Sequence, residues 1–279
     1  MLLNVNLTDE EFKKFSALIY EKAGIYLKAE KKELLNARLS KRLRACQIGS
    51  FKEYFKLISK PDQKNREFIH FLDAVSTNYT SFFREISHFN YLASTVMPTL
   101  IKERSNFSNK EFFFWSSASS SGEEPFTLAM VLDNFFRTHP GFRFKIMATD
   151  ISTKVLQKAV QGVYAAEQVN NIPDDFLKRY LQRGVGQSAG KVKIKENIRK
   201  AVSYQRFNLM HDFPWKNEID VIFCRNVMIY FDRVTQERLV NKFYSCLKKG
   251  GYLFIGHSES IAGIKHDFQQ VEATTYIKL

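Results

Sequence analysis

The sequence predicts an α/β protein in which a small all-helical amino-terminal region precedes a doubly wound, Rossmann-like sheet. Residues 112–115 form a short apolar run, followed by a bend of small residues at 116–122 and by a helix-forming stretch around Pro125. This is the order of a buried strand, a tight turn and a helix. Residues 142–148 alternate like a second strand and lead to Asp150. Repeated strand and helix signals of this kind indicate a parallel sheet.

The bulk composition limits the class of protein. The 279 residues suffice for one large domain or two small ones. The amino terminus is too polar for a signal peptide, and no apolar run is long enough to span a bilayer. Cys46, Cys224 and Cys246 lie far apart, so we expect no disulfide framework, no metal site and a reducing, cytoplasmic location. The net charge of +13 favours an acidic partner: nucleic acid, an anionic membrane or an acidic protein surface.

The amino-terminal quarter predicts four helices. Thr8 and Glu11 have the spacing of a capping box. A second helix covers about 30–45, a third begins near Ser50, and a fourth covers about 66–76. One side of the second helix is basic, and this face is either merely solvated or a docking face for an acidic partner. The basic residues of this stretch are Lys28, Lys31, Lys32, Arg38, Lys41, Arg42 and Arg44.

The middle of the chain predicts a hinge, two helices and a hairpin. Residues 77–84 mix turn-prone residues with a Phe pair and predict an interdomain hinge. Arg84 is then either a surface residue or an active-site residue that the hinge presents. Residues 88–102 and 173–181 predict helices. Residues 183–202 predict a small basic β-hairpin. It is either a loop that recognises a partner or a solvent-exposed hairpin whose lysines only prevent its edge from pairing with other strands.

The last third predicts strands and one long helix. Residues 219–224 are the most strand-like run and are expected at the centre of the sheet. Asp232 can cap the following helix, and the cations and glycines at 248–251 suit its carboxyl end. In order, the predicted elements are a strand at 203–207, a strand at 219–224, a helix at 233–247, a strand at 252–256 and a final hairpin within 268–279.

Charged residues beside the bend indicate the kind of ligand. Gly122 is the only glycine of the bend, so the spaced glycines of a dinucleotide site are missing. Glu123 and Glu124 would repel phosphate and suit a hydroxyl or a cation, although they also complement the helix dipole. Asp150 stands where doubly wound folds bind ribose hydroxyls. An adenosine-type cofactor without a phosphate loop is therefore indicated, and S-adenosylmethionine, which carries a sulfonium cation, fits.

Five segments resemble the CheR family of chemotaxis receptor glutamate methyltransferases. They follow the family's order over almost the whole chain, and their combination is specific. Departures are mild: Phe126 stands where Tyr is common, and Tyr79 where Leu is common. The matching segments are residues 77–84, 115–125, 148–151, 223–231 and 256–260.

The resemblance implies a domain organisation and an activity. It implies a helical receptor-docking domain at 1–76, a linker at 77–90, and a class I S-adenosylmethionine-dependent methyltransferase domain at 91–279 with a β-subdomain at about 183–202. The implied reaction transfers a methyl group from S-adenosylmethionine to glutamate carboxylates of chemotaxis receptors, which gives methyl esters for chemotactic adaptation. The implied product of the cofactor is S-adenosylhomocysteine.

The resemblance also implies site residues and partners. The basic second helix (Lys31, Lys32, Arg38, Lys41, Arg42 and Arg44) would face the acidic helical bundle of the receptor. The β-subdomain binds a carboxyl-terminal tether peptide of the receptor in some members of the family. By motif matching, the implied cofactor-binding residues are Asn78, Thr80, Arg84, Glu124, Asp150, Asn208, Leu209, Arg225 and Asn226.

The chemistry needs orientation more than proton transfer. A glutamate side chain in water has a pKa of about 4.3, so its carboxylate is already ionised at neutral pH and no general base is required. Arg84 can hold a carboxylate in a planar fork, and the Tyr230 hydroxyl can orient the nucleophile. We assign both as catalytic orienters, with simple packing as the alternative for Tyr230. Cys224 is expected to be a small buried residue and His257 a structural one.

Two other functions agree with parts of the sequence. An RNA or DNA methyltransferase would suit the positive charge. Amine-methylating enzymes of that kind carry prolines and an aromatic residue after the fourth strand to stack a flipped base, whereas 225–230 contain no proline. A non-catalytic adapter that binds S-adenosylmethionine as a signal is the second rival, and retention of Arg84 and Tyr230 argues against it.

Overall fold

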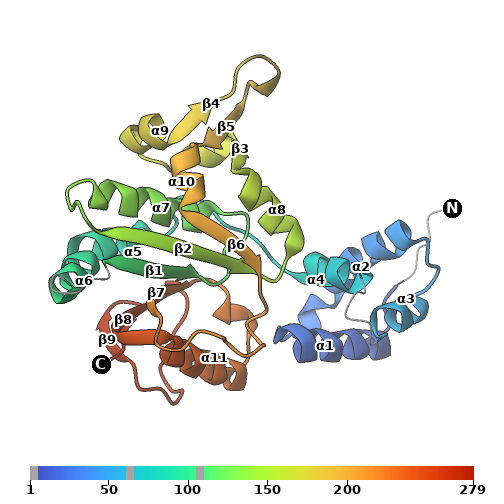
Figure 1. Ribbon diagram of the computed structural model, residues 1–279. Coiled ribbons are helices and arrows are strands. Elements are labelled where there is room, and N and C mark those ends of the chain that lie inside the picture. Colours follow the sequence, from blue (N-terminus) through green and yellow to red (C-terminus); the bar gives the residue numbers. More distant parts are fainter. Residues whose placement is uncertain (1–5, 61–65, 105–109) are drawn as a thin grey trace.

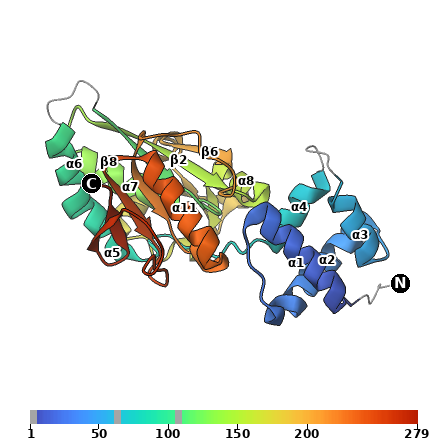
Figure 2. The same ribbon diagram turned by 90° about the horizontal axis from the view of Figure 1, so that it is seen from below.

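The computed structural model describes residues 6–60, 66–104 and 110–279. A group of amino-terminal helices lies on one side of a larger α/β domain, beside the ends of its strands (Figure 1). Seen from below, α1 lies beside the start of α11, and α4 lies beside α8 (Figure 2). The amino-terminal helices therefore reach the sheet domain at one end only, the end where its parallel strands terminate.

The predicted amino-terminal helices are present. Thr8 and Glu11 form the capping box, in which the Thr8 hydroxyl accepts from the Glu11 N–H. The helices pack around buried aromatic side chains, with Phe15 between Phe51 and Phe71. This packing stabilises four short helices that would be marginal alone. Their bounds are α1 Asp9–Ala23, α2 Lys32–Cys46, α3 Phe51–Ile58 and α4 Arg66–Val75.

A seven-stranded sheet forms the second part, as predicted. Its strand order is β6-β2-β1-β7-β8-β10-β9, so β7 is the central strand. The first five strands in this order are parallel to one another, and β10 runs antiparallel to β8. The bounds are β1 Glu111–Ser116, β2 Arg143–Asp150, β6 Val202–Arg206, β7 Ile219–Cys224, β8 Leu247–Ile255, β9 Gln269–Glu272 and β10 Thr275–Ile277.

Helices cover both faces of this sheet. Side chains of β1 alternate between two cores: Phe112 and Phe114 join one, and Trp115 joins the other. The first core includes α7 and the α5–α6 segment, whereas the second includes α11, with Phe243 against Trp115. The helices are α5 Ile86–Tyr91, a π-helical turn Leu92–Val96, α6 Met97–Arg104, α7 Glu123–Phe136, α8 Thr153–Gln161 and α11 Arg233–Cys246. Two hydrophobic layers around one sheet account for much of the high Phe content.

The small β-subdomain differs from the hairpin predicted at 183–202. It is a three-stranded antiparallel sheet in the order β3-β5-β4. The prediction was wrong in extent because β3 comes from far upstream, and pairing between distant segments leaves no local signal. The second half of the predicted hairpin is a helix, α10. The elements are β3 Val163–Ala165, α9 Asp174–Tyr180, β4 Leu181–Arg183, β5 Lys191–Ile194 and α10 Glu196–Lys200.

Helix α11 ends one residue earlier than predicted, and no turn follows it. The helix stops at Cys246, and Leu247 is already extended as the first residue of β8. The predicted helix closure at 248–251 therefore belongs to the strand. Lys248 reaches the buried Asp220 carboxylate at 3.0 Å instead of facing the helix end. Within the described residues, no helix is both long and apolar enough to cross a bilayer.

Asp220 links three segments in the core. Its carboxylate accepts from the Phe113 N–H at 2.7 Å and pairs with Arg104 and Lys248, and it is 1% exposed. Asp220→Ala leaves these donors without their acceptor, so we expect the free energy of unfolding to fall by about 3–5 kcal/mol. Urea denaturation measures this change, and the exposed Asp267→Ala should stay within about 0.5 kcal/mol of wild type. Equal effects of the two substitutions would contradict the assignment.

Candidate active site

A cavity of about 830 Å³ lies at the carboxyl ends of β1, β2 and β7, where the amino-terminal helices meet the sheet domain. The chain passes from β1 to β2 on one side, and β7 lies on the other, so the cavity sits where the strand order reverses. Ligands of doubly wound sheets bind at such a point. Every site residue predicted from the sequence lines it: Asn78, Thr80, Arg84, Glu124, Asp150, Asn208, Leu209, Arg225, Asn226 and Tyr230.

The small-residue bend brings backbone to the cavity wall. Ser117 donates its N–H to the Phe223 carbonyl, which ties the bend to β7. Ser120 and Gly122 have left-handed φ angles of 47° and 98°. At Gly122 a Cβ would meet Ala159 at 2.9 Å. Glycine is therefore required there on both steric and conformational grounds, which explains the single glycine among serines.

Asp150 is held by backbone at the end of β2. One carboxylate oxygen accepts from the Ser120 N–H and the other from the Ser152 N–H, each at 2.9 Å. Burial raises the pKa of Asp150 although these hydrogen bonds lower it. Each oxygen keeps a further lone pair. The carboxylate is thus oriented and can still accept from ligand hydroxyls in the cavity.

Glu124 and Arg225 form the charged part of the wall. Ser116 donates to Glu124 at 2.7 Å, and the Arg225 guanidinium lies 3.5 Å from the other carboxylate oxygen. Burial raises the pKa of Glu124 despite Arg225. Arg225 also pairs with Glu85 at 3.0 Å and stacks against Phe89. Glu85 thus balances the charge of Arg225, and the Glu124 carboxylate remains a buried acid at the cavity wall that favours a cationic group of a ligand beside it.

Glu259 fixes the loop that carries Arg225 and Asn226. Its carboxylate accepts from the N–H groups of Gly256, Asn226 and Met228 at 2.6, 2.9 and 2.7 Å. These bonds hold Asn226 in a left-handed conformation, with φ of 57°. The role of Glu259 was missed from sequence, as was that of Glu85. Glu259 does lie in the 256–260 motif, whereas Glu85 is marked only by its position after Arg84.

The linker supplies a second wall. Ser120 donates its hydroxyl to the Asn78 carbonyl at 3.0 Å, so the linker is bonded to the bend. The Arg84 guanidinium donates to the Tyr79 carbonyl at 3.1 Å and lies 5.7 Å from the Tyr79 ring centroid. Tyr79 is 80% exposed. Thr80 lies between these residues on the same wall.

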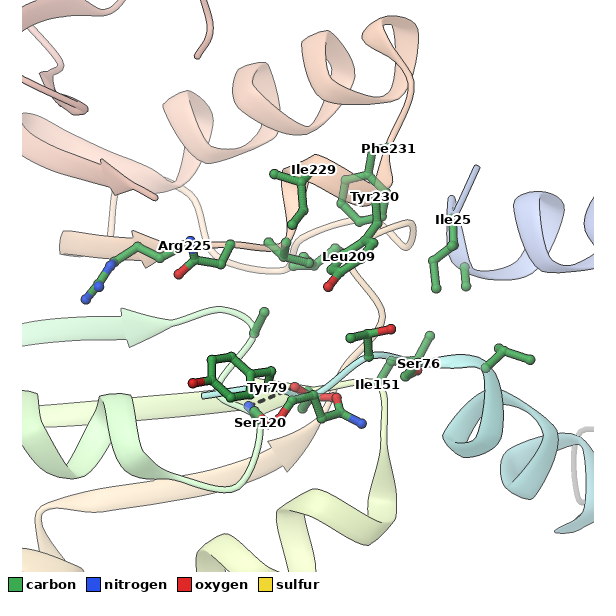
Figure 3. Close-up of a pocket in the computed structure, with 18 of the residues that line it drawn as sticks. Ile25, Ser76, Tyr79, Ser120, Ile151, Leu209, Arg225, Ile229, Tyr230 and Phe231 are labelled. Carbon is green, nitrogen blue, oxygen red and sulfur yellow. Dashed lines mark hydrogen bonds between the residues drawn. The ribbon is translucent and has the colours of Figure 1, made fainter. Parts of the chain in front are cut away.

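The opposite wall consists of Leu209, Ile229 and Tyr230, which face Tyr79 and Ser120 across the cavity (Figure 3). Leu209 is buried and offers an apolar surface to a ligand ring.

Asn208, in contrast, does not present a free amide. It donates to the Lys22 carbonyl at 2.6 Å and accepts from the Met210 N–H at 3.0 Å. Its side chain therefore joins the two domains, a role that the motif did not predict.

The amino-terminal helices border the cavity directly. Tyr26 donates its N–H to the Tyr230 carbonyl at 2.8 Å, next to an isolated bridge between Ile25 and Phe231. Lys31 and Arg38 are among the lining residues. Arg38 is half-buried and donates to the Val75 carbonyl and the Thr77 hydroxyl.

Arg42 does not line the cavity and is only partly exposed. It forms two hydrogen bonds to Glu67, at 2.9 and 2.6 Å, and Tyr54 donates to the same carboxylate. Its charge is therefore already balanced within the amino-terminal helices, so it has less to offer a docking partner than the sequence predicts. The sequence of a helix shows on which side of the helix a residue lies. It does not show that α4 packs against that side of α2 and brings Glu67 to Arg42.

These features define the class of protein. The site combines a doubly wound sheet, an acid at the end of β2 (Asp150), a buried acid at the start of α7 (Glu124) and an apolar wall. These features fit an adenosine-type cofactor with a cationic centre. The class is a Rossmann-like methyltransferase that uses S-adenosylmethionine.

Comparison with known proteins gives the family. Residues 78–277 match the family described as "CheR methyltransferase, SAM binding domain", and residues 10–76 match "CheR methyltransferase, all-alpha domain". A chemotaxis protein methyltransferase of Borreliella burgdorferi is 40% identical over 99% of this chain and 96% of its own, and one of Escherichia coli is 38% identical over 97% and 91%. The chain belongs to the CheR methyltransferase family, and its cofactor is S-adenosylmethionine.

Solved structures in the comparison are more distant. A DszA carbon methyltransferase is 15% identical over 88% of this chain and 51% of its own, with a TM-score of 0.37. A geranyl diphosphate methyltransferase in complex with S-adenosylmethionine is 10% identical over 72% and 57%, with a TM-score of 0.34.

Binding of S-adenosylmethionine should depend on pH, because burial raises the pKa of Glu124. A proton on Glu124 removes the negative charge that favours a cation. Affinity for S-adenosylmethionine should therefore fall as pH is lowered toward and through the pKa of Glu124, which burial raises above its ordinary value. Calorimetric titration at several pH values measures this. Glu124→Gln should bind more weakly with a flatter pH profile, and S-adenosylhomocysteine, which lacks the sulfonium charge, should show less pH dependence. An unchanged profile in Glu124→Gln would contradict the role of this carboxylate.

Proposed function

We propose that this protein transfers the methyl group of S-adenosylmethionine to glutamate side-chain carboxylates of chemotaxis receptors and forms methyl esters. The observation that carries the proposal is that a guanidinium, Arg84, and a phenol, Tyr230, line the same cavity as the acids Glu124 and Asp150. The acids suit the cofactor, and the donors suit an incoming carboxylate. The relatives named chemotaxis protein methyltransferase support the receptor as substrate.

Separate groups of residues hold the two substrates. Asp150 and Glu124 are suited to the ribose hydroxyls and the cationic end of the cofactor, and Leu209 to its adenine. Asn78 and Thr80 from the linker, with Arg225 and Asn226 from the end of β7, complete this part of the wall. When bound, S-adenosylmethionine supplies a methyl group on a sulfonium sulfur that a carboxylate can attack.

The remaining residues orient the nucleophile. A receptor glutamate is ionised at neutral pH, so the site has no proton to remove. Arg84 can hold one carboxylate oxygen in its planar fork, and the Tyr230 hydroxyl can donate to the same group. Tyr79 and Ile229 border the opening with exposed apolar surface, which displaces water from the carboxylate as the receptor docks. Positioning of this kind contributes up to about 7–11 kcal/mol.

The exposed part of the basic helix is the proposed receptor-docking face. Lys31, Lys41 and Arg44 are exposed along α2 and the turn before it, and Lys31 also lines the cavity. An acidic receptor helix lying on this face would bring its glutamates to the cavity mouth. Lys32 bonds to Asp9 at 2.6 Å, and Arg38 to the linker, so these two contribute less.

The small sheet is a second proposed contact. β4 is an edge strand of that sheet, and a receptor's carboxyl-terminal tether peptide can add to such an edge through main-chain hydrogen bonds. Exposed cations on β4 and β5, Arg183, Lys191 and Lys193, favour an acidic peptide.

Methyl transfer from tritiated S-adenosylmethionine tests the proposed activity. Incubation with receptor-rich membranes should give protein-bound tritium that mild base releases as methanol, because carboxyl methyl esters are base-labile. Methylation of nucleic acid would give a base-stable product, and a non-catalytic adapter would incorporate nothing. Either of these results would reject the proposal.

Arg84→Ala tests the orientation of the nucleophile. Loss of one fixed donor to the reacting group should lower kcat/KM by about 100-fold or more. Arg84→Lys keeps the charge but not the fork and should remain at least about tenfold impaired. The exposed Arg137→Ala serves as a control with full activity. Wild-type turnover by a folded Arg84→Ala protein would contradict the assignment.

Charge reversal tests the docking face. Lys41→Glu combined with Arg44→Glu should raise KM for receptor membranes by about tenfold, with kcat changed little, because neither residue lines the cavity. The effect should shrink at high salt. A matched reversal of the exposed Arg137 and Lys249, at the end of α7 and in the first half of β8, should leave KM unchanged. Equal effects of the two reversals would indicate general charge steering instead of docking at α2.

A further inference from the structure

Three side chains converge behind the Arg225 wall of the cavity. Glu85 precedes α5, His88 lies in α5, and His257 follows β8. Their nearest potential ligand atoms lie within 4.8 Å of one another. His88 Nδ1 lies 3.6 Å from a Glu85 carboxylate oxygen, and the two imidazole ring centroids are 4.6 Å apart. The proposed methyl transfer uses none of these three side chains directly.

Thr274 is the hydrogen-bond partner of the second ring nitrogen of His88. The Thr274 hydroxyl lies 2.7 Å from His88 Nε2 and 2.8 Å from the Ala273 carbonyl, to which it can donate. Donation to that carbonyl leaves the Thr274 oxygen to accept from Nε2, which frees the lone pair of Nδ1 for a ligand. Nδ1 has no hydrogen-bond partner among the described residues, and His88 is 2% exposed.

His88 Nδ1 thus faces a Glu85 carboxylate oxygen across 3.6 Å, with no hydrogen bond between them. A buried ring nitrogen without a partner is costly, and a metal ion between the two groups would supply one. Zn–N and Zn–O bonds of about 2.0–2.2 Å place two ligands of a tetrahedral ion about 3.4 Å apart. The observed separation is close to this value.

We propose that Glu85, His88 and His257 bind a divalent transition-metal ion of the zinc type. Two imidazoles and one carboxylate are a common donor set for zinc, with a fourth position left to water. His257 is exposed and gives the ion access from solvent, while Thr274 orients His88 from outside the site, as partners of metal-bound histidines do. The wide spacing of the cysteines argues only against a metal site with cysteine ligands. It does not conflict with a site formed by histidines and a carboxylate.

The neighbouring Arg225 sets a limit on affinity. It donates to the Glu85 oxygen that faces His88, at 3.0 and 3.2 Å, and a carboxylate oxygen has lone pairs for both a donor and a metal. The guanidinium charge opposes that of the ion, so binding should be weaker than at an isolated site of the same donors. The bound ion would join α5 to the turn after β8, directly behind the cavity wall.

Cobalt(II) is the probe, since its visible spectrum reports tetrahedral coordination. The full-length chain, first stripped with a chelator, should bind one equivalent and develop the absorption of a tetrahedral nitrogen and oxygen site. His257→Ala should weaken binding at least about tenfold, whereas the exposed His211→Ala should match wild type. Because His257 is exposed, circular dichroism should show that this variant folds.

A second pair of variants tests the orientation of His88 without removing a ligand. Thr274→Ala should weaken cobalt binding by about 10–100-fold, and Thr274→Ser, which keeps the hydroxyl, should not. Absence of binding by wild type, wild-type affinity in His257→Ala, equal affinities of the two Thr274 variants, or a thiolate-to-cobalt band from a cysteine would each overturn the proposal.

Discussion

The buried guanidinium of Arg225 joins the parts of the site. Its side chain is 1% exposed and lies between the carboxylates of Glu85 and Glu124. These three residues come from the linker, the start of α7 and the end of β7, so a single charge connects segments that are far apart in the sequence. A buried arginine without its acids would be strongly destabilising. The cluster therefore fixes the linker against the sheet and holds the Glu124 carboxylate at the cavity wall.

Backbone geometry provides the other half of the site. The bend after β1 approaches the cavity because its residues are small and because Ser120 and Gly122 adopt left-handed conformations. Glu259 similarly holds the loop after β7 through several backbone N–H groups. In both places, an acid accepts from main-chain donors: Asp150 at one and Glu259 at the other. Rigid loops at the carboxyl ends of the strands are what position ligand-binding groups in folds of this type.

The amino-terminal helices are part of the cavity and not only an appendage. Main-chain atoms of Tyr26 and Lys22 bond to Tyr230 and Asn208, and Tyr20 donates to Asp232 at the start of α11. Residues of these helices and of the turns beside them therefore close part of the cavity wall. The proposed docking charges and the proposed nucleophile-orienting groups come from different domains, and of these docking charges Lys31 also lines the cavity.

The sequence by itself determined the features that depend on neighbouring residues. The capping box at Thr8, the strand, bend and helix around Gly122, the central strand β7 and the two acids Glu124 and Asp150 were all predicted from local patterns, and the motif order indicated the family. Only the tertiary structure decided the three-stranded subdomain, the pairing of Arg42 with Glu67, the interdomain role of Asn208 and the cluster around Glu85. Each of these rests on contacts between residues far apart in the chain, and no local pattern encodes which distant group will satisfy a given charge or strand edge.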